Sequence, residues 1–188
     1  MLRGESIQLR PVRETDLNTL FMYLTDIQNR GDYFPINIHS EVKLRGQFQD
    51  SGFWSEDKGL LLILNEAAAI IGHIEFFKPI AYLDAYELSY QIYEPAERRK
   101  GATSEAVGLL TRYLFDTKKV NRLQLIMHPD NIASQRVAEK NGFVDEGTMR
   151  GAWYHRGQYH DVKVYALLRH EYNHNKQRDT ENSRLAHR

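Results

Sequence analysis

The 188-residue chain contains no cysteine. Disulfides, thiolate metal sites, iron–sulfur clusters and a cysteine nucleophile are therefore excluded. No uninterrupted apolar run is longer than Leu60–Leu64, whereas a bilayer crossing needs about 20 residues. The first residues, MLRGESIQLRP, have neither the apolar centre nor the small-residue cleavage site of a signal peptide. We therefore expect a cytoplasmic protein without a membrane partner.

An excess of charge of one sign is missing as well. The 25 Lys+Arg residues balance the 25 Asp+Glu residues, whereas a dedicated nucleic-acid binder normally carries a basic excess. We therefore expect no direct nucleic-acid partner. Apolar residues make up 41% of the chain and aromatic residues 11%, which is enough to build the core of one globular domain.

Hydrophobic periodicity predicts alternating strands and helices along most of the chain. The strongest helix prediction covers Gly101–Phe115, where apolar residues recur at steps of three and four. Asn131 is placed to cap a short helix over Ile132–Lys140. The other expected elements are helices that begin at Thr15 or Asp16 and at Ser40, and strands over Ile7–Arg10, Leu60–Leu64, Ala69–Phe77, Tyr86–Tyr93, Arg122–Met127, Phe143–Gly147 and Tyr159–Leu168. This order predicts a single mixed α/β domain.

The C-terminal part of the chain is predicted from its polarity. The last two strands are expected to be joined through Trp153–Gly157. From Arg169 onward the chain is polar and is expected to fray. The predicted organisation is a domain over residues 1–172, followed by a polar tail over residues 173–188.

The segment from Arg98 to Ala106 has the features of a phosphate-binding loop. It follows a predicted strand and opens a predicted helix, so backbone N–H groups and the positive end of the helix dipole can face an anion. Arg98, Arg99 and Lys100 add positive charge. The segment lacks the spacing of a P-loop and of a dinucleotide site, which leaves another phosphate-bearing ligand. A solvated basic turn is the alternative.

Several motifs resemble those of the GNAT acetyltransferases. Arg98-Arg99-Lys100-Gly101-Ala102-Thr103 is similar to the acetyl-CoA pyrophosphate signature of that family, R-x-x-G-x-[small]. The segments Asn131-Ile132-Ala133-Ser134, Lys140-Asn141-Gly142-Phe143 and Gly157-Gln158-Tyr159-His160-Asp161-Val162 extend the likeness to the branch that acetylates the N-termini of ribosomal proteins. The resemblance runs from about residue 5 to residue 172.

The resemblance implies the GNAT acyl-CoA N-acyltransferase fold, a single mixed, mostly antiparallel twisted sheet flanked by helices. It also implies acetyl-CoA as the co-substrate and no metal. In this family the strand before the loop splays from its neighbour, so an N–H of Ile92 or Tyr93 would polarise the thioester carbonyl. The pyrophosphate would lie on Arg98, Arg99, Lys100, Gly101, Ala102, Thr103 and Ser104.

The resemblance also assigns roles around the reacting sulfur. It gives Asn131 a contact with the cofactor arm, beside the capping role that its position alone predicts. It places Ser134 next to the departing sulfur, where the hydroxyl can donate a hydrogen bond or a proton to the thiolate. Several relatives place a tyrosine four positions further on, where this chain has Ala138.

The general base is not fixed by the resemblance. The closest branch often has a glutamate at the position that Trp153 occupies here. Glu75 resembles a strand glutamate of the polyamine-acetylating relatives and is our candidate, with a surface role on an edge strand as its alternative. Glu87 and His73 stay open, and strand alternation puts His73 on the same face as Glu75.

The function implied is an acetyl-CoA-dependent N-acetyltransferase that acts on a primary amine by direct attack in a ternary complex. The first acceptor hypothesis is a protein N-terminal α-amino group, with that of a ribosomal protein as one candidate. The second is a small amine such as a polyamine or an aminoglycoside. The third is a non-catalytic acetyl-CoA-binding module. We also consider a homodimer.

Overall fold

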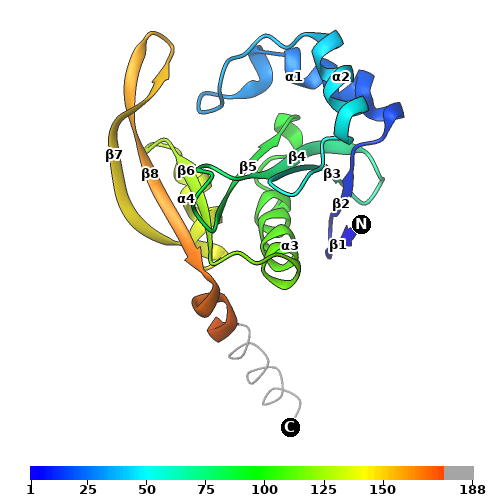
Figure 1. Cartoon of the computed structure of the whole chain (residues 1–188). Coiled ribbons are helices and arrows are strands. Elements are labelled where there is room, and N and C mark those ends of the chain that lie inside the picture. The colour runs from blue at the N-terminus through cyan, green and yellow to red at the C-terminus, as the bar shows by residue number, and fades with distance from the viewer. Residues whose placement is uncertain (176–188) are drawn as a thin grey trace.

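The computed structural model describes residues 1–175, and the strands within them form one eight-stranded sheet (Figure 1). The strand order is β1-β2-β3-β4-β5-β6-β8-β7, and only β5 and β6 pair in parallel. The strands are β1 (Leu2–Arg3), β2 (Gln8–Pro11), β3 (Lys58–Leu64), β4 (Ile70–Phe77), β5 (Ala85–Ile92), β6 (Arg122–Met127), β7 (Val144–His155) and β8 (Gln158–Leu168). The helices are α1 (Leu17–Thr25), α2 (Glu41–Ser51), α3 (Ala102–Thr117) and α4 (Ile132–Lys140), with short 3₁₀ helices η1 (Glu14–Asp16), η2 (Gln28–Arg30) and η3 (Pro95–Glu97). The expected fold class is confirmed.

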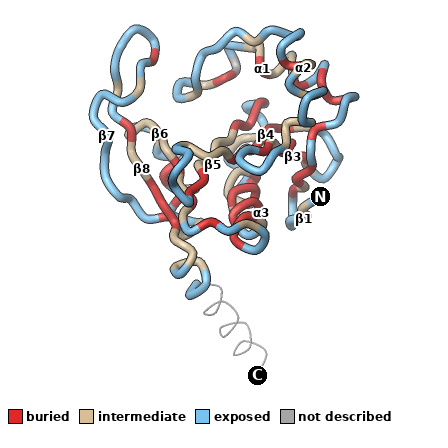
Figure 2. Tube along the Cα trace, viewed as in Figure 1, coloured by how far each residue is buried: buried red, intermediate tan, exposed pale blue. Residues whose placement is uncertain are grey.

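Helices cover both faces of the sheet. The apolar residues of β3 contribute to two cores, one on each face of the sheet. Leu61 and Ile63 belong to the core with α3, whereas Leu62 and Leu64 belong to the core with α1 and α2. Successive side chains of a strand point to opposite faces, so a strand covered on both sides needs apolar residues at every position. Figure 2 shows this burial along α3 and the central strands, in contrast to the exposed β7.

Most predicted elements agree with the structure, and α4 and β6 agree to the residue. Ser40 caps α2 as expected, because its hydroxyl accepts from the Lys43 backbone N–H at 3.4 Å. The strand β1 was missed, since two residues are too few to show a periodicity.

Asp16 is the N-cap residue of α1, in agreement with the expectation that this helix begins at Thr15 or Asp16, but its side chain makes no hydrogen bond to the helix. Its carboxylate instead accepts from Arg10 at 2.6 and 2.9 Å and from the Arg13 N–H at 2.7 Å. The stronger charge-assisted partner therefore takes the carboxylate, which ties η1 to β2.

β7 and β8 form a long curved hairpin at one side of the molecule (Figure 1), and near its turn His155 Nε2 lies 3.0 Å from the Asp32 carbonyl, in the segment between α1 and α2. Trp153 was expected in the connection between them but lies inside β7, opposite His160. The turn is only Arg156-Gly157, with φ values of +50° and +85°. The pairing of β7 is irregular between Asp145 and Gly147 and again between Met149 and Trp153, so the alternation that marks a strand is interrupted.

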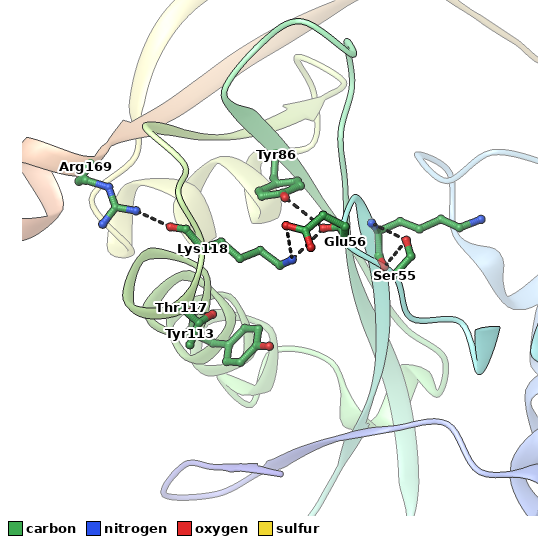
Figure 3. A network of polar contacts seen from close by, with 8 residues as sticks. Ser55, Glu56, Tyr86, Tyr113, Thr117, Lys118 and Arg169 are labelled. Carbon is green, nitrogen blue, oxygen red and sulfur yellow. Dashed lines mark hydrogen bonds and ion pairs between the residues drawn. The ribbon is translucent and has the colours of Figure 1, made fainter.

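The end of α3 is tied to the rest of the molecule by a polar network (Figure 3). Lys118 Nζ donates to the Glu56 carbonyl at 2.8 Å, and the Tyr86 hydroxyl donates to the same carbonyl at 3.1 Å. Arg169 donates to the carbonyls of Phe115, Val120 and Lys118, each at 2.7 Å. The last carbonyls of a helix lack partners within it, so this guanidinium satisfies the end of α3.

The expected fraying therefore does not begin at Arg169. Residues 169–175 are helical, and Tyr172 stacks on Phe115 with ring centroids 4.9 Å apart. The remainder of the predicted tail, residues 176–188, lies outside the described residues. The domain boundary at residue 172 stays a prediction.

Candidate active site

β5 and β6 separate along their length. They pair only between Ala85–Glu87 and Arg122–Gln124, although β5 continues to Ile92 and β6 to Met127. The two strands thus splay apart as the resemblance implied, and β5 has backbone groups that β6 does not use.

The alternation of β5 decides which amides face this opening. The Tyr93 N–H donates to the Ile71 carbonyl at 2.9 Å, so this pair is hydrogen-bonded toward β4. Because antiparallel pairs alternate, Ile92 and Tyr90 turn their N–H and C=O groups away from β4 and toward the opening. The expectation that Tyr93 could donate to the thioester is therefore wrong, since its N–H is already used, and Ile92 is the donor that the register favours.

The loop before α3 has the backbone of an anion site. Arg99 and Gly101 have φ values of +63° and +90°, and Gly101 directly precedes α3. Left-handed residues at a helix start turn successive N–H groups toward one concave side. A Cβ on Gly101 would have no atom within 4 Å, so the glycine serves the backbone angle and leaves open space in front of the loop.

The side chains of the loop differ in their partners and in their burial. Arg98 donates from Nε to the Ile92 carbonyl at 3.3 Å and from Nη2 to the Tyr93 carbonyl at 3.2 Å, which braces the loop against the end of β5. Lys100 lies 3.3 Å from Glu97. The other predicted members are Ala102, which is buried, Thr103, which is half-buried, and Ser104, whose hydroxyl accepts from Asn141 at 3.2 Å.

A cavity of about 830 Å³ lies beyond the opening. Its walls come from β4 and β5, from the segment between α1 and α2, and from β7 and β8. Three predicted site residues line it, Glu75, Asn131 and Ser134, and Trp153 lines it as well. The residues of the loop before α3 are not among those that line it, whereas residues of β5 and β6 at the opening are.

Glu75 lies on an interior strand, because β4 is paired on both sides. The alternative of a surface carboxylate on an edge strand is therefore wrong. Burial raises the pKa of Glu75, the charge of Glu87 raises it further, and a hydrogen bond with Ser89 opposes the shift. Burial also raises the pKa of Glu87, which accepts from Gln124 at 2.9 Å. A carboxylate with a raised pKa is a stronger base.

The structure separates His73 from Glu75, which the sequence left as equivalent. Both line the cavity, as the alternation predicted. The His73 ring is 3% exposed, its Nδ1 lies 2.8 Å from the Tyr93 hydroxyl, and burial lowers the pKa of His73 to about 4. A neutral ring with so low a pKa is the weaker base, so Glu75 remains the better candidate.

Ser134 lies at the start of α4, where Asn131 caps the helix by accepting from the Ser134 backbone N–H at 3.1 Å. The Tyr90 hydroxyl is buried without a hydrogen-bond partner, and this burial raises the pKa of Tyr90 to about 12, while the nearby Ser134 hydroxyl opposes the shift. The sequence placed the backbone of Tyr90 on the splayed strand but did not predict that its side chain lines the cavity. Ala138 is fully buried, so nothing reaches the cavity from that position.

Trp153 belongs to an aromatic wall that also went unrecognised. It stacks on His155 with centroids 4.2 Å apart, and His128 Nε2 lies 3.2 Å from His160 Nδ1. The Asp130 backbone N–H donates to His128 Nδ1 at 3.1 Å, so His128 Nε2 carries the proton shared with His160. Both nitrogens of His128 are occupied, which makes it part of the wall rather than a base. Within residues 1–175 no group of His, Asp or Glu is arranged to hold a metal.

The splayed strands, the amide-rich loop at a helix start and the cavity across the opening define an acyl-CoA-dependent transferase. The family profile described as "Acetyltransferase (GNAT) domain" matches residues 6–144, and the chain belongs to this family. It is an N-acetyltransferase with acetyl-CoA as co-substrate.

Known relatives cover almost the whole chain. The uncharacterized N-acetyltransferase YnaD of Bacillus subtilis is 27% identical over 88% of this chain and 95% of its own length. The ribosomal-protein-serine acetyltransferase of Escherichia coli is 25% identical over 88% of this chain and 94% of its own length. The crystal structure of the Vibrio cholerae spermidine N-acetyltransferase, in complex with CoA and spermine, shares the fold with a TM-score of 0.77 at 20% identity, over 88% of this chain and 97% of that one. No helix within residues 1–175 has the length and apolar character that a bilayer crossing requires.

Proposed function

We propose that the protein transfers the acetyl group of acetyl-CoA to the α-amino group of a protein N-terminus, by direct attack in a ternary complex. The observation that carries this proposal is the opening between β5 and β6, because residues of both strands line the cavity together with Glu75 and Ser134. The name of the ribosomal-protein-serine acetyltransferase supports a protein as the acceptor.

Acetyl-CoA would bind from the side of α3 and α4. The N–H groups of the loop from Arg99 to Ser104 hold the pyrophosphate, while Arg98 keeps the loop in place against the end of β5. The backbone groups of Tyr90 and Ile92 pair with the pantetheine arm, and Asn131 contacts the arm from the start of α4. The Ile92 N–H then faces the thioester carbonyl and stabilises the oxyanion that forms there.

The acceptor amine would enter from the cavity. Its nitrogen attacks the thioester carbon, the C–S bond breaks, and the amine loses one proton. Glu75 accepts this proton, directly or through a water, and its raised pKa suits it to the task. Ser134, which lines the same cavity, donates to the departing sulfur.

A small polyamine is the second candidate acceptor. Glu75 and Glu87 both line the cavity and attract a cationic group. The Vibrio cholerae relative is named as a spermidine acetyltransferase, although its likeness at 20% identity shows the fold alone. A homodimer also stays a prediction.

Thiol release from acetyl-CoA tests the proposal. The acceptors are peptides with a free α-amine, the same peptides with a blocked N-terminus, spermidine and an aminoglycoside, and mass spectrometry locates the acetyl group. We expect the highest kcat/KM for the free α-amine and none for the blocked peptide. A higher value for spermidine would favour the second candidate, and no turnover with any acceptor would favour a binding module.

A further inference from the structure

Arg30 is a buried cation on the wall of the cavity. Arg30 is the last residue of η2, in the segment between α1 and α2, and it lines the cavity although it is only 5% exposed. Burial lowers the pKa of Arg30, as expected when the charged form loses its hydration. A cation in such a place normally has a carboxylate or a phosphate as partner.

The described part of the chain supplies no such anion. Arg30 Nη1 donates to the Pro35 carbonyl at 2.6 Å, Nη2 lies 3.0 Å from His39 Nε2, and the guanidinium stands 5.5 Å from the Phe34 ring centre. All three partners are uncharged groups. Nε is buried without a hydrogen-bond partner, and no carboxylate among residues 1–175 lies within ion-pair distance. Two of the five N–H donors are used, so the fork keeps capacity for a carboxylate.

The cation and the proposed base share one neighbour. Burial raises the pKa of the Tyr93 hydroxyl, Arg30 lowers it and Glu75 raises it, so both charges act on the same group. The cavity lining thus contains a buried cation, Arg30, and the two carboxyl groups of Glu75 and Glu87. An acceptor with both an amine and an anion complements these charges.

We propose that Arg30 binds a carboxylate of the acceptor, so that the preferred substrates are amines that carry a carboxylate close to the amino group. Arg30, Glu75 and Ser134 line the same cavity, so the carboxylate belongs to the first residues of the acceptor and not to a distant part of it. It comes from an acidic side chain or from the C-terminus of a very short acceptor. This assignment rests on the proposed function of the same cavity. It disfavours polyamines, which have cationic groups only.

The test uses matched acceptors that differ only in the carboxylate. Ser-Asp-Ala-amide and Ser-Asn-Ala-amide compare a side-chain carboxylate with its neutral isostere, and Ser-Ala and Ser-Ala-amide do the same for a terminal carboxylate. The proteins are the wild type, Arg30→Gln, Arg30→Lys and the control Arg45→Gln. Arg45 pairs with Glu41 on the exposed side of α2, so this control removes a charge nearby without reaching the cavity.

Two readouts keep substrate binding apart from turnover. The first is kcat/KM from thiol release. The second is the fluorescence of Trp153, which lines the cavity, during titration of each peptide into the CoA-loaded protein. The melting temperature of every variant shows that it is folded, and Arg30→Lys keeps the charge where Arg30→Gln alone is too unstable.

The wild type and Arg45→Gln should prefer at least one carboxylate peptide over its neutral partner by about tenfold or more in both readouts. Arg30→Gln should bring that ratio to about one, and Arg30→Lys should keep part of it. An unchanged ratio in Arg30→Gln, or a wild type that prefers neither member of a pair, would overturn the inference and leave Arg30 as a brace for the Pro35 segment. Tight carboxylate-dependent binding without turnover would instead count against the proposed reaction alone.

Discussion

Replacing Gly101 by aspartate tests the assignment of the pyrophosphate to the loop before α3. Gly101 has a φ of +90°, and a Cβ added to it would meet no protein atom within 4 Å. The substitution therefore changes two things only: the strain of a left-handed residue, about 1–2 kcal/mol, and a negative charge in front of the loop.

The charge sets the expected loss of affinity. A carboxylate about 5 Å from one phosphate charge is repelled by about 0.8 kcal/mol in a water-like dielectric and by about 3 kcal/mol at an effective dielectric constant of ~20. We therefore expect the dissociation constant for CoA to rise more than tenfold, which corresponds to about 1.4 kcal/mol. Isothermal titration calorimetry measures it directly.

Gly157 provides the matched control for backbone strain. Its φ is +85° and it also has no atom within 4 Å of an added Cβ, but it lies in the turn between β7 and β8. Gly157→Asp should lower the melting temperature about as much as Gly101→Asp and leave CoA affinity unchanged. Equal CoA affinity in folded Gly101→Asp and wild type would refute the phosphate assignment, and so would an equal loss in both variants.

Three further predictions follow from the catalytic residues and from the core. Ser134→Ala should lower kcat by about tenfold to a thousandfold with little change in CoA affinity, because the hydrogen bond from Ser134 to sulfur strengthens in the transition state. The control Ser51→Ala, at another point of the cavity wall, should retain kcat. Full kcat in Ser134→Ala would leave Ser134 as a helix-start serine without a catalytic role. Glu75→Gln should slow the acetylation of spermidine more than that of an α-amino peptide, since an alkyl amine titrates at ~10.4 and an α-amine at ~8. The variant should also flatten the acidic limb of the pH profile of kcat/KM. Wild type and variant that are equally active on both acceptors between about pH 6 and 9 would remove Glu75 from the mechanism. Asp16→Asn should lower the free energy of unfolding by about 3–5 kcal/mol, because it leaves the buried Arg10 without its partner. Arg10 holds the pKa of Asp16 below its ordinary 3.8. The difference in the free energy of unfolding between wild type and variant, measured with urea, should therefore have its full size above pH 3.8 and shrink as the pH falls through the lowered pKa. A difference that does not change with pH would contradict this ion pair.

The elements that the sequence predicted best are those whose signals are local. The caps Ser40 and Asn131 and the apolar spacing of α3 fix their helices from neighbouring residues alone. Asp16 occupies the N-cap position of α1 as predicted, but its carboxylate bonds to Arg10, six positions away, which no local pattern indicated. The full length of β7 was not predicted, because its two irregularities interrupt the alternation of apolar and polar residues that marks a strand.

The sequence could propose site residues where contiguous motifs carry the family resemblance, but not where distant segments meet. The loop motif and Ser134 are proposed from such motifs. The role of the Ile92 amide depends on the register of β5 against β4, which no local pattern encodes. The burial of Arg30 and the wall around Trp153 arise only when the segment after α1 and the hairpin of β7 and β8 close over the sheet.

Initial-rate kinetics with a peptide that has a free α-amine test the central claim most directly. Acetyl-CoA and peptide are varied together, thiol release is followed, and the product is sequenced by mass spectrometry. Direct transfer in a ternary complex predicts intersecting double-reciprocal lines and an acetyl group on the α-nitrogen. Parallel lines with an acetylated enzyme intermediate, or acetyl-CoA binding without thiol release for any amine, would contradict it.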